Sequence, residues 1–234
     1  MPRYIHIAEV ASTNTYLAGT AAVLPGGTVI YTSRQTAGRG QKGNSWESEP
    51  GKNLTFSMLL KRPPVAPQRQ FAISEAVSVA IVDVLNTLGD GFAIKWPNDI
   101  YWRDGKIGGI LIENTLQGNS VKDCIIGIGL NVNQRVFLSN APNPVSLWQI
   151  SEQETDCEQL LHDILEAFQD YLGKYNKDEY LSMLYRRKGF HPYSDKDGPF
   201  MAELVDVEDS GHLLLRDDDG KERRYAFKEV TFIQ

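Results

Sequence analysis

The chain contains several short runs of apolar and β-branched residues, separated by glycine-rich or polar stretches. Runs of this length and composition are typical of β-strands, and the stretches between them are typical of turns and loops. The stretch between the first two runs is long, polar and rich in glycine, which predicts a substantial loop. The predicted strands cover residues 26–35, 53–61, 92–96, 107–114 and 123–132.

A different spacing of apolar positions predicts helices. Between residues 70 and 88 apolar side chains recur at steps of three and four, which is the pattern of a helix with one buried stripe. Residues 158–171 keep the same spacing, and a further helical piece is expected over 178–187. Together with the strands, these helices predict an α+β fold, a mixed sheet with its helices on one face.

The composition of the chain changes after Arg187. Residues 188–234 alternate short strand-like pieces with Ser-Gly and Asp-Gly turns, which is the pattern of a small meander β-barrel. We therefore expect two domains, residues 1–187 and residues 188–234. The second is short for an independent core, so it is expected to pack against the first.

Composition and charge narrow the class of protein. Of the 234 residues, 41% are hydrophobic and 23% are charged, which is close to an ordinary globular protein. The formal net charge of −6 argues against a protein built mainly to grip nucleic-acid phosphates. The longest apolar runs fall far short of the roughly 20 residues that cross a bilayer. Neither DNA nor a membrane is an expected partner.

Cysteine usage and the amino terminus favour a cytoplasmic location. The first residues lack the charged-then-apolar layout of a signal peptide. Cys124 and Cys157 do not have metal-ligand spacing, and Cys124 opens an apolar run, which predicts a buried and inert thiol. The four histidines show no ligand spacing either.

Residues 38–43, GRGQKG, match the dinucleotide-binding pattern GxGxxG but not its context. That pattern should open a helix and be followed about 20 residues later by an acidic ribose ligand, whereas a strand-like run follows here. A glycine-rich loop that carries Arg39 and Lys42 can still bring backbone N–H groups and positive charge against a phosphate. A surface hairpin loop with ordinary charged residues is the alternative.

Four separated segments stand out when the chain is read in order. They are STN at 12–14, QTAGRGQKGNSW at 35–46, KWPNDIYWRDGKIGGILIEN at 95–114 and GIGLNVN at 127–133. In order and spacing they resemble the biotin protein ligase family. The resemblance implies the class II synthetase-like catalytic domain of that family, and residues 188–234 resemble its small SH3-like C-terminal domain.

The resemblance implies a two-step reaction with biotin and ATP as substrates and Mg²⁺ as cofactor. The biotin carboxylate attacks the α-phosphate of ATP, which gives biotinyl-5′-AMP and pyrophosphate. A lysine of a biotin carboxyl carrier domain of an acyl-CoA carboxylase then attacks the mixed anhydride. This chemistry requires positive charge on the phosphates, a metal for pyrophosphate and a lid that excludes water.

Four residues are implied as catalytic. Lys106 matches a lysine that reaches both the biotin carboxylate and the α-phosphate, and Arg39 matches the first arginine of the family's glycine-rich loop. Asp99 matches a residue near the phosphates, where it would share a magnesium ion or take a proton from the incoming amine. A purely structural role in a turn is the alternative for Asp99. Lys95 would contact a phosphate or pair with Asp99 as scaffold, and the sequence leaves both open.

The binding residues implied by the resemblance fall into two groups. Ser12 also has an interpretation as a helix N-cap, and the glycines also fit close packing in a buried strand. Gln41 stands where many family members carry a second arginine, which helps to retain the adenylate. The biotin group is Ser12, Thr13, Gln35, Gly38, Arg39, Lys106, Gly109, Gly127 and Gly129, and the adenylate group is Arg39, Gln41, Lys42, Trp46, Asn98, Lys106 and Asn131.

Several alternatives stay open at the level of sequence. Lipoate ligation or acyl transfer uses a related fold and a carrier lysine. A biotin-sensing repressor would need an N-terminal DNA-binding domain, for which no room is expected before residue 12. A catalytically inactive carrier-binding module is a third alternative. An edge-to-edge homodimer and the role of the residues after 187 are also left open.

Overall fold

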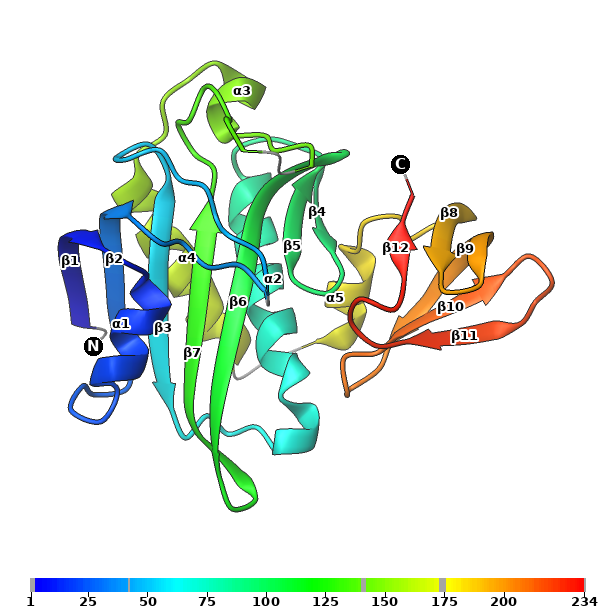
Figure 1. Cartoon of the computed structure of the whole chain (residues 1–234), viewed down its shortest axis with the longest axis horizontal. Helices are drawn as coiled ribbons and strands as arrows, with labels where there is room; N and C mark the ends of the chain where they lie inside the picture. Colours follow the sequence, from blue (N-terminus) through cyan, green and yellow to red (C-terminus); the bar gives the residue numbers. More distant parts are fainter. Residues whose placement is uncertain (1–2, 42, 140–141, 173–175, 234) are drawn as a thin grey trace.

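The computed structural model describes residues 3–41, 43–139, 142–172 and 176–233. Within these ranges seven strands form one sheet in the order β1-β2-β3-β7-β6-β5-β4 (Figure 1). β1 and β2 are parallel and the other neighbours are antiparallel, so the sheet is mixed, as predicted. The strands are β1 (Arg3–Val10), β2 (Thr28–Gln35), β3 (Leu54–Lys61), β4 (Phe92–Lys95), β5 (Asp99–Trp102), β6 (Gly105–Gln117) and β7 (Ser120–Leu130).

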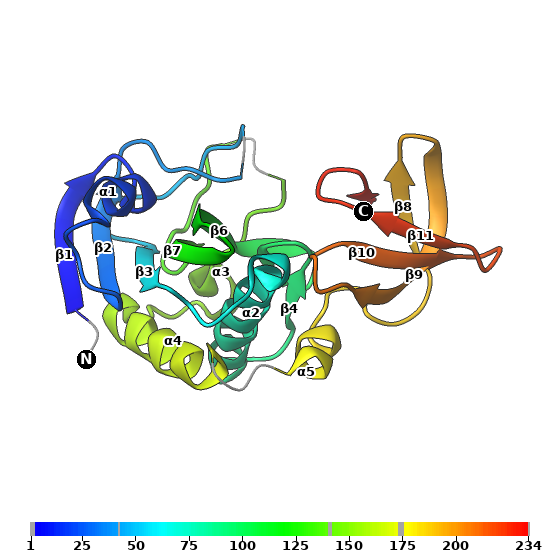
Figure 2. The same cartoon turned by 90° about the horizontal axis from the view of Figure 1, so that it is seen from below.

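Helices cover both faces of this sheet, which corrects the prediction of helices on one face. α2 (Phe71–Asn86) and α4 (Cys157–Leu172) bury the main core on one face. On the other face lies α1 (Thr13–Thr20), as Figure 2 shows. Its buried Leu17 belongs to a second, smaller core cluster. Because strand side chains alternate between faces, a sheet whose strands are apolar throughout must be covered twice.

The remaining helices are short. They are α3 (Leu147–Ser151), α5 (Lys177–Ser182) and a 3-10 turn (Pro67–Arg69). The helical piece expected over 178–187 therefore ends early. The reason is a tertiary contact: residue Ile94 of β4 donates its amide to the carbonyl of Met183 (2.8 Å) and accepts one from Tyr185 (2.8 Å). The chain after α5 therefore runs alongside β4 instead of continuing the helix.

The residues after 187 form a separate antiparallel sheet in the order β11-β10-β9-β8-β12. It packs against the larger part of the molecule: the Trp96 indole donates to the carbonyl of Gly211 (2.9 Å). No helix in the described ranges is long and apolar enough to cross a membrane. The strands are β8 (His191–Asp195), β9 (Gly198–Val207), β10 (Leu213–Asp217), β11 (Glu222–Tyr225) and β12 (Thr231–Phe232).

Candidate active site

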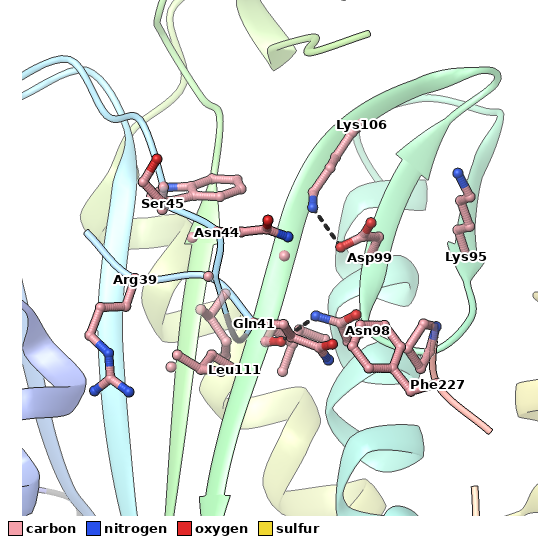
Figure 3. Close-up of a pocket in the computed structure, with 18 of the residues that line it drawn as sticks. Arg39, Gln41, Asn44, Ser45, Lys95, Asn98, Asp99, Lys106, Leu111 and Phe227 are labelled. Atoms are coloured by element: carbon pink, nitrogen blue, oxygen red, sulfur yellow. Dashed lines mark hydrogen bonds and ion pairs between the residues drawn. The ribbon is translucent and has the colours of Figure 1, made fainter. Parts of the chain in front are cut away.

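A cavity of about 370 Å³ opens where the main sheet, the glycine-rich loop and the C-terminal segment meet (Figure 3). Its volume lies within the range of small-molecule sites, about 300–1,000 Å³. The structure brings most of the predicted site residues to its wall. Those that line it are Ser12, Thr13, Gln35, Arg39, Gln41, Trp46, Lys95, Asn98, Asp99, Lys106, Gly109, Gly127 and Gly129.

One part of the wall is uncharged and closely hydrogen-bonded. Ser12 caps α1 and accepts a backbone N–H of its first turn (3.5 Å), so the N-cap interpretation is confirmed. The amide of Thr13 donates to Gln35 Oε1 (2.9 Å). Ser57 Oγ lies 2.6 Å from Thr13 Oγ1 and 2.6 Å from Asn14 Oδ1. We call Thr13, Asn14, Gln35 and Ser57 the polar floor: the first three line the cavity, and the fully buried Ser57 supports them from behind. Asn14 and Ser57 were not predicted from the sequence.

The opposite part of the wall is charged. Lys106 near the start of β6 places its Nζ 2.6 Å from Oδ1 of Asp99 on β5, the pair joined by a dashed line in Figure 3. The two side chains are 27% and 23% exposed. The carboxylate thus holds the Lys106 side chain at the cavity wall.

Lys95 lies beyond Asp99 at the end of β4. Its Nζ donates to Tyr101 Oη (2.8 Å) and sits 5.3 Å from the ring centre of Phe232. Burial lowers the pKa of Lys95; Asp99 opposes this shift, and the positive charge of Lys106 adds to it. No ion pair joins Lys95 to Asp99 among the described residues, so the scaffold pairing left open by the sequence is not formed here.

Arg39 points away from the charged wall, as Figure 3 shows. Its Nη2 lies 2.7 Å from Glu113 Oε1, and its Nη1 donates to Thr15 Oγ1 (3.2 Å). Arg39 thus lines the cavity, but its guanidinium is paired with Glu113 and lies outside the Lys106–Asp99 pair. Lys42, the other predicted cation of this loop, lies outside the described residues.

Two glycines of the cavity wall allow close approach of protein side chains, whereas Gly109 has room for a methyl group. A Cβ on Gly129 would lie 2.5 Å from the Trp46 ring, and a Cβ on Gly127 would collide with the Asn14 amide. A Cβ on Gly109 would lie 3.5 Å from the same indole and 3.6 Å from Lys106 Nζ. The close-packing interpretation therefore holds for Gly127 and Gly129, although both also line the cavity.

Two predicted binding residues do not line the cavity. The Asn131 amide is buried and donates to the carbonyl of Val145 (3.1 Å). This hydrogen bond ties the end of β7 to the chain before α3. Gly38 accepts a backbone bond from Trp46 (3.0 Å), where a side chain would collide with that residue's carbonyl. Both positions shape the loop and strand ends behind the wall.

The two polar side chains between these regions differ in their contacts. Asn98 donates to the carbonyl of Ile110 (2.7 Å), so its side chain ties the turn before β5 to β6. Gln41 has its Oε1 buried with no hydrogen-bond partner in the part of the chain that the structure describes. A buried acceptor without a partner costs free energy, so the position of this oxygen is unfavourable in the present arrangement of the loop.

The C-terminal segment completes the cavity, a role that no local pattern in the sequence predicts. It follows β11 and approaches the charged wall beside Lys95. Phe232 packs against Tyr185 (ring centres 6.3 Å apart) as well as facing Lys95. The residues of this segment that line the cavity are Phe227, Lys228, Val230, Thr231 and Phe232.

Known proteins resemble this chain over most of its length. The bifunctional ligase/repressor BirA of Bacillus spizizenii is 29% identical over 215 residues, which cover 86% of this chain and 65% of that protein. This chain thus spans slightly less than two thirds of that relative. The biotin–[acetyl-CoA-carboxylase] ligase of Paracoccus denitrificans is 29% identical over 233 residues, which cover 92% and 95%.

A solved structure and a family profile point to the same kind of protein as these relatives. The biotin protein ligase of Aquifex aeolicus, solved in complex with biotin and ATP, superposes with a TM-score of 0.80 at 25% identity over 100% of both chains. The profile of the biotin/lipoate A/B protein ligase family matches residues 7–131. The resemblance seen in the motifs is therefore confirmed. The chain belongs to the biotin/lipoate A/B protein ligase family.

Proposed function

We propose that this protein forms biotinyl-5′-AMP from biotin and ATP and transfers biotin to a lysine of a biotin carboxyl carrier domain. The observation that carries the proposal is the pairing, in one cavity, of the polar floor with the Lys106–Asp99 pair. Biotin has a neutral ring system with donors and acceptors at one end and a carboxylate at the other. The cavity offers matching groups at its two ends.

The first step needs two anions to meet. The biotin carboxylate oxygen attacks the α-phosphorus, the bond to the bridging oxygen breaks, and pyrophosphate leaves. Lys106 would approach both anions and stabilise the charge that develops between them. Its 2.6 Å contact with Asp99 keeps it in the cavity wall until the anions arrive. Arg39 would add a second positive charge as its loop closes over the ligand.

The second step needs a neutral amine. A free lysine titrates near about 10.4, so the carrier lysine must lose a proton before or during its attack on the anhydride carbonyl. The C–N bond forms, the bond from carbonyl carbon to phosphate oxygen breaks, and AMP leaves. Asp99 would accept the proton once Lys106 is engaged by the phosphate, because its carboxylate then loses its partner.

Mg²⁺ fits this cavity only in part. No group of three His, Cys, Asp or Glu side chains that could hold a metal occurs among the described residues. Mg²⁺ often binds through one or two carboxylates plus substrate phosphates and water, and Asp99 supplies one carboxylate. Asp99 would thus hold the ion together with ATP, and the ion would neutralise the leaving pyrophosphate.

We also propose a division of labour between residues 1–187 and 188–234. The first would be the catalytic domain and the second the SH3-like domain of the family. Support comes from the five-stranded antiparallel sheet after residue 187 and from the contact of its last strand with Lys95. The small domain would close the nucleotide end of the cavity.

Incorporation of labelled biotin into a carrier domain tests the function directly. The full chain is incubated with ATP, Mg²⁺, labelled biotin and a biotin carboxyl carrier domain, and the label on the carrier is counted. Biotin-dependent exchange between ATP and pyrophosphate reports the first step alone. Lipoate is run in parallel, because the family includes lipoate ligases. Incorporation of lipoate but not biotin would overturn the proposal, and absence of exchange would favour an inactive carrier-binding module.

A further inference from the structure

The ion pair between Arg39 and Glu113 joins a flexible group to a fixed one. Glu113 Oε2 accepts from Asn14 Nδ2 (2.9 Å), and the same amide group donates to the carbonyl of Leu111 (3.2 Å). Asn14 is 3% exposed and is held from the other side by Ser57. The carboxylate of Glu113 is therefore anchored to the polar floor through a buried amide.

Arg39, by contrast, sits on the glycine-rich loop. The backbone of that loop forms a hairpin, in which the Gly40 N–H donates to the carbonyl of Asn44 (2.9 Å) and the Trp46 N–H to that of Gly38 (3.0 Å). The guanidinium reaches out of the loop to Glu113, with contacts of 2.7 Å and 3.5 Å to the two carboxylate oxygens. The Arg39 side chain is long and 45% exposed, whereas the Glu113 carboxylate is held by a buried amide, so the guanidinium is the partner that can move, by rotation of its side chain.

The geometry also separates the pair from the reaction centre. Arg39 lines the cavity but Glu113 does not, and Figure 3 shows the Arg39 side chain directed away from Lys106 and Asp99. An anion placed beside Lys106 can be reached by the guanidinium only if the contact with Glu113 breaks. Glu113 thus competes with such an anion for the same five N–H donors.

We propose that Glu113 is a positioning residue that stores the Arg39 guanidinium outside the reaction centre and yields it to the anionic ligand. This inference rests on the proposed function, in which biotin and its adenylate carry that negative charge. The pair suits storage because its side chains are 45% and 35% exposed. Exposed ion pairs are weak, so a carboxylate or phosphate held by Lys106 can displace Glu113.

The test is the affinity for biotin and for biotinol, in which an uncharged alcohol replaces the carboxylate. Glu113→Gln removes the competing charge but keeps a side-chain oxygen for Asn14. Because an exposed pair changes affinity only modestly, we expect this variant to bind biotin about two- to fivefold more tightly than the wild type. Binding of biotinol should not change. The gain should shrink at high salt, which screens exposed charges.

Two further variants separate storage from a structural role. In an Arg39→Ala background, Glu113→Gln should no longer alter the Kd for biotin. Thr15→Val removes the other acceptor of the guanidinium and should tighten biotin binding in the same direction but less, which keeps the test available if Glu113→Gln folds poorly. Glu208→Gln, which breaks the Arg224–Glu208 pair of similar exposure in the small sheet, is the matched control.

The outcomes are distinguishable. Unchanged or weaker biotin binding in Glu113→Gln, or equal tightening of biotinol, would overturn the storage role while leaving the proposed function intact. Wild-type protein that neither binds biotin nor exchanges pyrophosphate would overturn the proposed function and this inference with it. Selective tightening that vanishes without Arg39 would establish the competition.

Discussion

The two ends of the cavity are built on different principles. In the polar floor, Thr13, Asn14 and Ser57 are 3%, 3% and 0% exposed, and they satisfy one another by hydrogen bonds. At the charged end, Lys106 and Asp99 keep about a quarter of each side chain in solvent, with 27% and 23% exposed. Neutral polar groups can be buried once they are paired, whereas buried charges carry a far larger desolvation cost.

This difference separates two tasks. A buried, mutually bonded floor is fixed before the ligand arrives and can select a neutral ring by the placement of donors and acceptors. An ion pair that keeps about a quarter of each side chain in solvent can exchange its internal partner for a ligand anion at lower cost than a fully buried pair. Changes at the charged end should therefore affect the rate of adenylate formation, and changes at the floor should affect affinity and stability.

Removal of the Lys106 ammonium should have the largest effect. We expect Lys106→Ala to lower biotin-dependent ATP–pyrophosphate exchange by at least about two orders of magnitude, the loss typical of a removed charge stabiliser. Lys122→Ala, at a lysine about half exposed on β7, serves as control and should react at the wild-type rate. Near-normal exchange in Lys106→Ala would reject the assigned role.

A methyl group on Gly127 should disturb the floor rather than the charged end. The added Cβ collides with the Asn14 amide, and overpacking of this kind typically costs about 1–3 kcal/mol. We expect Gly127→Ala to lose that much in free energy of unfolding and to bind biotin more weakly. Gly19→Ala is the control, because no atom lies within 4 Å of its Cβ. Denaturant unfolding and calorimetric titration check both, and wild-type affinity would show that the floor does not contact biotin.

Loss of the Ser57 hydroxyl should have a smaller effect of the same kind. Thr13 and Asn14 each lose a hydrogen-bond partner in Ser57→Ala, and a typical hydrogen bond contributes about 0.5–1.5 kcal/mol to stability. Ser78→Ala removes a buried hydroxyl from α2 that bonds neither a cavity residue nor the polar floor, and it should cost a similar stability. Only the Ser57 variant should weaken biotin binding. Equal biotin affinities in the two variants would contradict a recognition role for the floor.

Local patterns predicted much of the fold. The five strands and two long helices expected from apolar spacing occur as β2, β3, β4, β6, β7, α2 and α4. β1 was missed because it is an edge strand whose residues are mostly exposed or half-buried, which weakens its apolar signal. β5 has only four residues, too few for a pattern. α1 was predicted only as a cap because a single leucine anchors it.

The site was predictable where motifs are contiguous and not where it depends on strand register. The motifs placed Thr13, Gln35 and Lys106, and the structure brings them to one cavity. Ser57 carries no motif. It matters because β3 pairs with β7 so that Ser57 lies opposite Gly127, whose missing side chain leaves room for Asn14. Such a pairing of distant positions cannot be derived from one sequence.

The smallest predicted effect concerns the protonation of Lys95 at the charged end. Burial lowers the pKa of Lys95 below its ordinary value of 10.5; Asp99 opposes this shift, and Arg186 and Lys106 reinforce it. Below the folded-state pKa, Lys95 is charged in both the folded and the unfolded protein, so the whole cost of burying the charge opposes folding. As the pH rises toward 10.5 the folded protein loses this proton before the unfolded chain does, so the wild type gains stability relative to Lys95→Met. Lys95→Met lacks the buried charge and should be more stable than the wild type at neutral pH. This difference in stability should shrink as the pH rises.

Thermal unfolding at about pH 7 and about pH 10 measures that narrowing. Because Lys95 is only half-buried, solvent screening keeps the effect small, and we expect the difference in Tm between variant and wild type to change by about 2 °C or less. Lys188→Met, at an exposed lysine, is the control and should show a difference that does not depend on pH. If the Tm difference between Lys95→Met and the wild type stays constant or widens, burial does not disfavour the charged form of Lys95. The contrast between a buried neutral floor and a charged end that needs contact with solvent would then fail at Lys95.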